Sequence, residues 1–405
     1  MVKRTGLKSG GWLNTMLPSR LEARKGVVPL GVLPGEGIGP EVIDVALRVL
    51  AAAGPAAARR LEVRLGGPIG RDAELLCGEA LTTETAEFCE SVFAAGGAVL
   101  AGPGGGRFVY DLRSRFDLFC KISPICPSAS RPRLGRLAAS DVGDADVLIV
   151  RENSGGIYMG ESSESTNGDG ERVCEHRFRY SEREVGRILE AAAKLAAQRR
   201  GMLAVVVKDG GMPAMTALWR EMAEDVAGRL RVRVSFLNID LAAYALVQKP
   251  RDFDVVVGQD LFGDVLADVG ALLLGGRGLS FSGNFSASGA AVYQTNHGGA
   301  ADIAGTDRAN PLGQIFALAF ALRESLGLPQ EAAWIEEAID EVLRQGLRTS
   351  DIADAGSHVV GTREMGEQIA AAVHRLSRSV PRPRGGDRNW RPRSTQPRNR
   401  IAARS

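Results

Sequence analysis

Short apolar runs alternate with stretches of helical pattern along most of the chain. The first run, residues 27–33, leads through a glycine-rich turn into a helix predicted over Glu41 to Ala53. Short buried strands that alternate with helices are typical of an α/β fold with a largely parallel sheet. Apolar runs of the same kind follow at residues 98–100, 146–150, 203–207, 233–237 and 254–257.

Composition places the chain among globular proteins and excludes a membrane span. With 405 residues, 44% of them hydrophobic and 24% charged, it is long enough for roughly two or three domain-sized units. No apolar run can span a bilayer, and even Ile315 to Leu322 is typical of a buried helix. The five scattered cysteines lack metal-finger spacing, which favours reduced thiols and a cytoplasmic location.

The net charge of +2 conceals a strongly basic end of the chain. Residues 377–405 contain nine Arg and one Asp, so this tail carries +8 and residues 1–376 carry −6. A basic tail can bind nucleic acid, but one so poor in apolar residues is more typical of a solvated, disordered extension. Residues 1–25, basic and nearly free of acids, are predicted to be a second disordered extension.

The glycine-rich turn after the first apolar run is a weak signal on its own. Gly35, Gly37 and Gly39 have the spacing G-x-G-x-G-P, not the G-x-G-x-x-G of a dinucleotide-binding fingerprint. No acid follows at the end of a clear second strand about 20 residues on. A plain strand-to-helix turn is therefore the better interpretation.

Two carboxylates are spaced to share a metal ion. Asp264 and Asp268 stand at i and i+4, which places them on one face of a helix where a hard cation could bridge them. Asp240 follows another apolar run and could supply a third ligand. The alternative is structural: Asp264 would cap the helix and Asp268 would be solvated.

Arginine and tyrosine side chains follow other strands. Arg113 and Arg151 are candidate carboxylate clamps, because a guanidinium binds a carboxylate through two parallel hydrogen bonds. Arg151 comes directly after the run 146–150, at a strand end where ligands gather in sheets of this kind. Tyr158 could act as a general acid, and its alternative is a half-buried packing role.

Several motifs together resemble the isocitrate/3-isopropylmalate dehydrogenase family, and they occur in order between about residues 27 and 373. They lie at residues 33–42, 151–160, 260–268, 297–305 with 309–311, 346–352 and 361–366. The resemblance implies a two-domain fold with a large mixed, mostly parallel sheet flanked by helices. Residues 26–125 and 270–376 would form the large, cofactor-binding domain. Residues 126–269 would form a small central domain with the dimer interface, including an arm in the stretch Glu161 to Glu175.

The resemblance also implies an NAD- and metal-dependent oxidation and decarboxylation of a malate-type 2-hydroxy diacid. Asp264 and Asp268, with Asp240 of the partner subunit, would hold Mg²⁺ or Mn²⁺ in a homodimer with shared active sites. Arg113 and Arg151 would hold the carboxylate that is lost, and Tyr158 would protonate the product enol.

For the cofactor, the resemblance implies that residues 297–305 wrap the adenosine end of NAD. An acid at Asp302 repels the 2′-phosphate of NADP and favours NAD. The residues expected to contact the cofactor are Gln294, His297, Gly298, Asp302, Ile303 and Asn310.

The sequence departs from the family pattern at the substrate anchor and the catalytic lysine. Ser123 stands where the family has a second Arg, and Lys121 is close enough to compensate in part. Counting from Trp219 puts Asp209 on the lysine position, with Lys208 one residue early and Gly211 in place of an Asn; either Lys208 or Asp209 could occupy the base position.

Other departures lie near the nicotinamide and near the variable part of the substrate. Gln294 replaces a glutamate near the nicotinamide ribose. Arg107, in the loop that selects the substrate, could meet an extra anion such as a carboxylate or phosphonate, or be solvated. Together these changes indicate a specialised paralogue that acts on a substituted malate, 3-isopropylmalate- or isocitrate-like or a phosphonate analogue. The alternative is a non-catalytic or regulatory family member.

Overall fold

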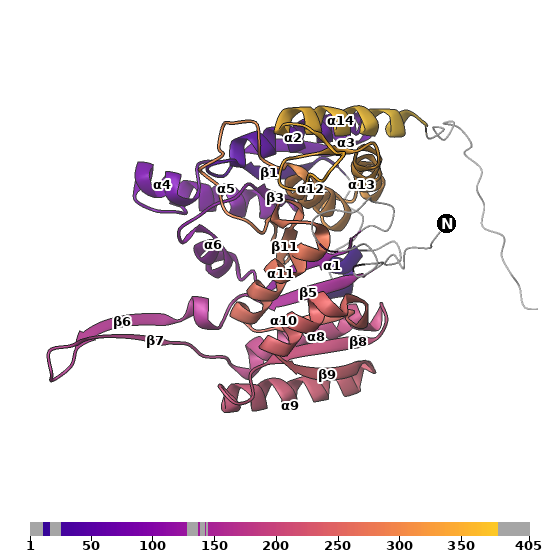
Figure 1. Ribbon diagram of the computed structural model, residues 1–405. Helices are drawn as coiled ribbons and strands as arrows, with labels where there is room; N and C mark the ends of the chain where they lie inside the picture. The colour runs from indigo at the N-terminus through magenta and orange to yellow at the C-terminus, as the bar shows by residue number, and fades with distance from the viewer. Residues whose placement is uncertain (1–10, 17–25, 128–136, 138–141, 143–144, 380–405) are drawn as a thin grey trace, which may run out of the picture.

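The computed structural model describes residues 11–16, 26–127, 137, 142 and 145–379. Ten of the described strands form one sheet that runs through the molecule, and helices flank it (Figure 1). The expected α/β fold with a large mixed, mostly parallel sheet is therefore confirmed. The strand order is β2 (Leu61–Leu65), β1 (Val28–Leu33), β3 (Ala98–Ala101), β12 (Ala291–Thr295), β11 (Phe281–Phe285), β4 (Cys120–Ile125), β5 (Val147–Glu152), β10 (Val255–Gly258), β8 (Met202–Val207) and β9 (Arg233–Asn238).

Strand direction reverses in the middle of this sheet. β11 is antiparallel to both β12 and β4, and β4 is antiparallel to β5. The neighbouring pairs outside these are parallel. Three successive antiparallel pairings leave β12 and β5 pointing in opposite directions. The motifs that follow β12 and those that follow β5 therefore lie at opposite ends of the strands. In a parallel sheet, all such motifs would lie at the same end.

β4 lies where two parts of the chain meet. The strands on its β11 side come from residues 28–101 and 281–295, and those on its β5 side come from residues 147–258. Lys121 in β4 is the cross-strand neighbour of Asn284 in β11 and of Arg151 in β5. A side chain on β4 therefore touches both parts of the sheet.

In the half of the sheet that contains β1, the flanking helices pack one against the next (Figure 1). α2 (Gly39–Ala52) lies against α14 (Thr362–Ser379), which lies against α13 (Pro329–Arg344), which lies against α12 (Leu312–Glu324). α12 covers β11 and β12 and is buried almost throughout, as expected for the apolar run within it. Smaller helices complete this half: α3 (Pro55–Arg60), α4 (Gly70–Cys77), α5 (Thr83–Ala94) and α6 (Phe108–Phe116).

The helices of the β5 half place the acidic motif against the sheet. α8 (Glu182–Ala197) begins at Ser181, whose side chain accepts from the Glu184 amide while Glu184 bonds back to Ser181. It packs against α9 (Pro213–Leu230), and α10 (Ile239–Gln248) packs against α11 (Asp260–Leu274). α11 lies on β4, β5 and β10, and it places Asp264 and Asp268 against them. The short elements are η1 (Ile157–Met159), η2 (Pro250–Asp252), η3 (Arg277–Leu279), β13 (Leu347–Arg348) and β14 (His358–Val359).

No described helix is both long enough and apolar enough to span a membrane. A separate antiparallel hairpin, β6 (Glu161–Thr166) with β7 (Arg172–Arg177), projects away from the body of the molecule (Figure 1). All residues of β6 are exposed. An isolated two-stranded hairpin is at best marginally stable in water, so we expect another surface to pack against this one.

The N-terminal region differs in part from the expected disordered extension. Residues 11–16 form helix α1 (Gly11–Met16), which packs against α8 and α12, while residues 1–10 and 17–25 lie outside the described residues. The amides of Trp12 and Leu13 donate to the carboxylate of Glu324, which is buried in α12. Burial raises the pKa of Glu324 to about 7. In the C-terminal extension, residues 377–379 belong to α14, and residues 380–405 lie outside the described residues.

Glu324→Gln tests this buried carboxyl. The pKa is about 7 in the folded protein against 4.5 for the free side chain, so the folded state loses stability as pH rises from 4.5 to 7. The variant lacks that loss, which amounts to about 3 kcal/mol at most. Its melting temperature should therefore fall less than that of the wild type over this pH range. Glu87→Gln, at an exposed position of α5, is the control, and identical pH profiles for all three proteins would contradict the assignment.

Candidate active site

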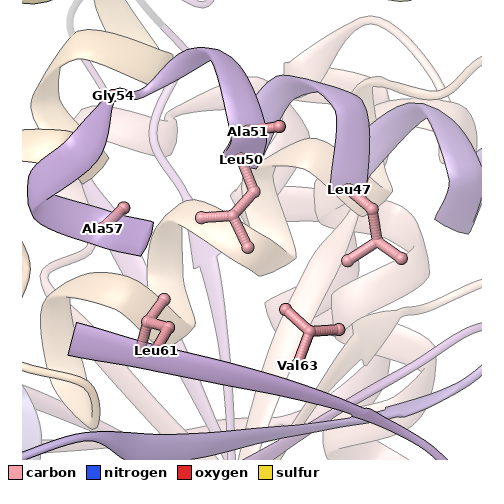
Figure 2. A pocket seen from close by; sticks show the side chains of 7 residues that line it. All are labelled: Leu47, Leu50, Ala51, Gly54, Ala57, Leu61 and Val63. Atoms are coloured by element: carbon pink, nitrogen blue, oxygen red, sulfur yellow. The ribbon is translucent and has the colours of Figure 1, made fainter. Parts of the chain in front are cut away.

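The one apolar pocket delineated in Figure 2 is not where the polar motifs converge. It has a volume of about 220 Å³ and lies between α2, α3 and the edge strand β2. Its lining contains no polar side chain, so it offers no group for acid–base or metal chemistry. The lining residues are Leu47, Leu50, Ala51, Gly54, Ala57, Leu61 and Val63.

Three buried cationic side chains converge where α6, β4 and β5 meet. Arg113, Lys121 and Arg151 are only 5%, 4% and 3% exposed. Burial, together with the charges of Arg151 and Arg113, lowers the pKa of Lys121 to about 7. Burial and the charge of Arg151 lower the pKa of Arg113 to about 10. Cations this close and this dry need anions, which makes the cluster a site for carboxylates.

Three aspartates on one face of α11 face these cations. Asp260, Asp264 and Asp268 follow one another at intervals of four residues. Asp260 Oδ1 accepts from Arg151 Nε at 3.0 Å and Nη2 at 2.6 Å, and Arg151 Nη1 bonds to Asp264. Asp268 pairs with Arg277 at 3.0 Å. The residue that precedes α11 is Gln259, so Asp264 does not cap the helix, and the structural alternative for it is wrong.

The aspartates have the chemistry of a divalent-cation site. Burial opposes ionisation of Asp264, but the charges of Arg151, Lys121 and Arg113 lower its pKa. Burial raises the pKa of Asp268, and the neighbouring charge of Asp264 adds to this rise. Two carboxylates that repel each other on one helix face offer the oxygen ligands that Mg²⁺ and Mn²⁺ take, so these residues fit such an ion.

The expected third ligand lies elsewhere in the same chain. Asp240, at the start of α10, is exposed and forms an ion pair with Lys208 Nζ at 3.0 Å. Among the residues that the structure describes, no group of three His, Cys, Asp or Glu side chains is arranged to hold a metal ion. Asp209 points to α9 instead, where it pairs with Arg220 at 3.0 Å. Lys208 and Asp209 therefore have different partners.

Two tyrosines adjoin the cations. Tyr158 in η1 lies with its ring 5.3 Å from the Arg151 guanidinium and in edge contact with Tyr110, whose ring is 5.8 Å away. Burial and the charge of Asp264 raise the pKa of Tyr158 to about 12, so the hydroxyl keeps its proton at neutral pH. Tyr158 thus lies in the polar cluster and not merely against apolar residues.

Arg107, in the loop expected to select the substrate, and Ser123, at the position of the expected second arginine, both bind other side chains of the protein. Arg107 is exposed and pairs with Asp111 at 3.3 Å. The Tyr110 ring lies between Arg107 and Arg113, 5.8 and 5.6 Å from their guanidinium carbons. At the position of the expected second arginine, the buried Ser123 hydroxyl accepts from Asn296 Nδ2 at 3.3 Å.

The glycine-rich turn packs against the segment expected to bind the cofactor. Gly37 has φ +58°, and a Cβ there would come within 2.0 Å of the Gly299 carbonyl oxygen. The Ile38 amide donates to that same oxygen at 2.7 Å. Ile303 joins Ile38 in a small apolar cluster. Gly37 therefore permits close approach of two backbones, which agrees with a turn as the better interpretation.

The remaining residues of that segment differ in exposure. His297 is half-buried, its pKa is lowered by burial, and its Nδ1 lies 3.0 Å from the Gly298 carbonyl oxygen. Asp302 is exposed, and Gln294 is half-buried in β12. Asn310 is buried, and its Nδ2 donates to the Asp351 carboxylate at 3.0 Å while its Oδ1 accepts from the Leu312 amide at 3.0 Å.

Reasoning from sequence missed three residues of the cluster. The Tyr110 ring contacts the guanidinium groups of Arg107 and Arg113, and the Tyr180 hydroxyl accepts from the Asp260 amide at 3.0 Å. Asp260 itself binds Arg151 and the Tyr158 amide. The spacing offered a signal for Asp260, since it precedes Asp264 by four residues, as Asp264 precedes Asp268. No pattern in the sequence pointed to the two tyrosines.

Gly263→Ala tests how closely Arg151 lies under α11. A Cβ at Gly263 would fall 2.7 Å from Arg151 Cβ and 2.9 Å from its Cγ. The substitution should lower the free energy of unfolding by about 1–3 kcal/mol, although Ala is the better helix former. Gly228→Ala in α9 is the matched control: it meets no atom within 4 Å and should leave stability unchanged or raise it by up to about 1 kcal/mol. Chemical denaturation measures both, and equal effects would contradict the close contact.

Known proteins share both the sequence and the fold of this chain. The isocitrate/isopropylmalate dehydrogenase family model matches residues 29–369. A 3-isopropylmalate dehydrogenase from Geobacillus kaustophilus (strain HTA426) is 36% identical over 365 residues, covering 85% of this chain and 95% of the relative. One from Synechococcus sp. (strain JA-3-3Ab) is 38% identical over 357 residues, covering 84% and 92%. The crystal structure of isocitrate dehydrogenase from Methylococcus capsulatus has a TM-score of 0.76 and 28% identity, covering 86% of this chain and 100% of the other. The chain therefore belongs to the isocitrate/isopropylmalate dehydrogenase family.

Proposed function

We propose that the protein catalyses the NAD- and Mg²⁺- or Mn²⁺-dependent oxidation and decarboxylation of a substituted malate-type 2-hydroxy diacid. The observation that carries the proposal is the set of three buried cations facing the aspartates of α11. Relatives named 3-isopropylmalate dehydrogenase support a decarboxylating hydroxy-acid dehydrogenase. The sequence departures near the site support a specialised substrate.

The cations are suited to holding the substrate carboxylates. Arg151 is already shared between two aspartates, whereas the structure gives Arg113 no carboxylate partner among the described residues, which leaves its charge for a ligand. Lys121 lies beside Arg151 on the neighbouring strand and can take the second carboxylate. Ser123 offers only a hydroxyl, so a side chain of the substrate near it meets no extra charge.

The charges of the cluster favour a dianion. Arg113, Lys121, Arg151 and Arg277 outnumber the three carboxylates by one, and a divalent ion would add two positive charges, so the cluster favours a ligand with at least two negative charges. An additional phosphonate would need Arg107, which now pairs with Asp111 on the surface. A diacid with an uncharged substituent is therefore the first choice, and a phosphonate analogue is the second.

Metal and nicotinamide would supply the chemistry that side chains lack. Asp264 and Asp268, with Asp240 of the partner subunit, would hold a Mg²⁺ or Mn²⁺ ion that would supply Lewis-acid chemistry at the substrate hydroxyl, and bound NAD would supply the hydride acceptor. Arg113 and Arg151 orient the carboxylate that leaves. The Tyr158 hydroxyl, protonated at neutral pH because its pKa is about 12, donates a proton to the carbon that loses CO₂.

Lys208 is the better candidate for the base that takes the hydroxyl proton. Its Nζ lies 3.0 Å from Asp240 Oδ1, so a lysine, which must first lose its own proton to act as the base, and an aspartate would reach the neighbouring site together. Asp209 is held by Arg220 and faces α9. For the cofactor, the exposed Asp302 carboxylate favours NAD because it would repel the 2′-phosphate of NADP.

A homodimer with shared sites is part of the proposal. α10 and α11 pack against each other, and each exposes large apolar side chains. A second copy of the chain that covers this face would also bring its own α10, with Asp240, toward the aspartates of α11. The exposed apolar residues are Leu241 and Tyr244 in α10 and Val265 and Leu272 in α11.

The alternative is a family member that binds ligand or partner without turnover. The buried Ser123 hydroxyl in place of an expected cation favours it, because one substrate anchor is then missing. The paired acids and cations of the main cluster favour an enzyme. Activity distinguishes the two hypotheses directly.

A panel of 2-hydroxy diacids and phosphonate analogues, assayed with Mn²⁺ and either NAD or NADP, tests the proposed reaction. We expect NADH and CO₂ to form from a malate with an uncharged substituent, and less product with NADP. Asp264→Asn, which removes one metal ligand, is the negative control. Absence of turnover throughout the panel would favour the non-catalytic alternative. Housekeeping rates with 3-isopropylmalate or isocitrate would contradict a specialised substrate.

Complementation tests the shared site. Lys208→Met and Asp264→Asn should each abolish activity, because every site in either homodimer then lacks one group. Mixed after reversible dissociation, the two variants should regain about a quarter of wild-type activity, since half of the dimers are mixed and each has one intact site. Lys249→Met, at an exposed lysine beyond α10, mixed with Asp264→Asn is the control. No gain in the Lys208→Met mixture would show that Lys208 acts within its own chain or not at all.

A further inference from the structure

Asp260 is a buried carboxylate that the proposed reaction does not use. It is 1% exposed and lies at the first position of α11, directly after β10. Its Oδ1 accepts from Arg151 Nε and Nη2, and its Oδ2 accepts from the Tyr158 amide at 3.0 Å. One carboxylate therefore fixes the end of β5, the start of η1 and the start of α11 to one another.

The surroundings of Asp260 leave it little freedom to move. Its own amide donates to the Tyr180 hydroxyl at 3.0 Å, and Tyr180 packs edge-on against Trp219 at 5.7 Å. Gly156 has φ +84°, and a Cβ there would lie 2.7 Å from Asp260 Cβ and 2.2 Å from the Tyr180 hydroxyl. A residue without a side chain at position 156 is therefore required for Asp260 to sit against this turn.

Asp260 also determines how Arg151 is shared between two acids. It takes two nitrogens of the guanidinium, Nε and Nη2, and leaves Nη1 for Asp264. The pair is almost completely dry, with 3% and 1% of the two side chains exposed, so the two charges compensate each other at close range. Without the charge of Asp260, Asp264 would be the remaining anion for Arg151 in this pair of contacts.

We propose that Asp260 is a positioning residue: it holds Arg151 side-on, so that Asp264 stays available to a divalent cation and Arg151 presents its outer edge to a carboxylate. The inference rests on the proposed function, because it assumes that Asp264 binds the metal. Through the Tyr158 amide, the same carboxylate also aligns η1 with the cluster.

Asp260→Asn removes the charge and keeps the shape. Arg151 should then bind Asp264 fully and compete with the cation. We expect the Kd for Mn²⁺, measured by calorimetry on the full chain without substrate, to rise about tenfold, which is typical for loss of a residue that orients a metal ligand. In turnover, the KM for the diacid should rise by a similar factor while the KM for NAD stays unchanged.

Asp254→Asn is the matched control. Asp254 is also 1% exposed and also pairs with arginine, Arg199 at 2.7 Å, but it precedes β10, whereas Asp260 follows it at the opposite end of the strand. This variant should lower the melting temperature and leave the Mn²⁺ affinity and both KM values unchanged. A purely structural role for Asp260 predicts that the two variants behave alike.

The outcomes separate this inference from the proposed function. A wild type that binds Mn²⁺ but turns over no diacid, together with weakened Mn²⁺ binding in Asp260→Asn, would overturn the reaction and support the positioning role. A wild type that turns over, with Mn²⁺ affinity and diacid KM unchanged in the variant, would overturn the positioning role alone. A wild type that binds no Mn²⁺ would overturn both.

Tyr180→Phe decides the question if Asp260→Asn does not fold. It removes only the acceptor of the Asp260 amide and keeps the ring on Trp219. The Kd for Mn²⁺ and the diacid KM should rise in the same direction as in Asp260→Asn, by a smaller factor. Unchanged values in a folded Tyr180→Phe protein would overturn the positioning role.

Discussion

The centre of the molecule depends on one constraint: the buried charged side chains of β4, β5 and α11 must neutralise one another. Burying a lone charge costs several kcal/mol, and breaking a buried pair leaves the other charge uncompensated. Arg151 of β5 and Asp260 of α11 meet this constraint directly, and Asp264 of α11 and Lys121 extend it to β4. The position of α11 on the sheet is therefore set by charge as well as by apolar packing. The same arrangement brings carboxylate-binding and cation-binding groups within reach of one small molecule.

The reversal of strand direction explains why such a cluster lies at mid-sheet. β4 is antiparallel to both of its neighbours, so its polar positions meet the carboxyl end of β5 on one side and the end of β11 on the other. The segments that follow β12 and β5 thus lie at opposite ends of the strands, and α11 lies on β4, β5 and β10. In a uniformly parallel sheet, these segments would all lie at the carboxyl ends of the strands.

Local pattern was enough to predict the apolar strands and the helix that carries Asp264 and Asp268, and it failed where strands are polar. β5, β8 and β10 are buried hydrophobic runs and were predicted nearly to their ends. β4 contains Lys121, Ser123 and Pro124, and β11 has Ser, Gly and Asn between two terminal Phe residues, so neither has the composition of a central strand. The roles of their polar residues can be recognised only in the folded chain, because their partners lie far away in sequence. For the same reason the role of Asp260 could not be inferred from spacing, although its charge and position in the motif were visible.

The order of strands has a consequence for synthesis of the protein. β3 pairs with β1 on one side and with β12 on the other, yet β12 is made almost two hundred residues later. During translation the open edge of β3 must wait while the whole β5 half is produced and folded. Long-range pairings of this kind slow folding, and an unpaired edge is a template for wrong partners. The first hundred residues are thus held in a partly assembled state until the chain returns to complete their sheet.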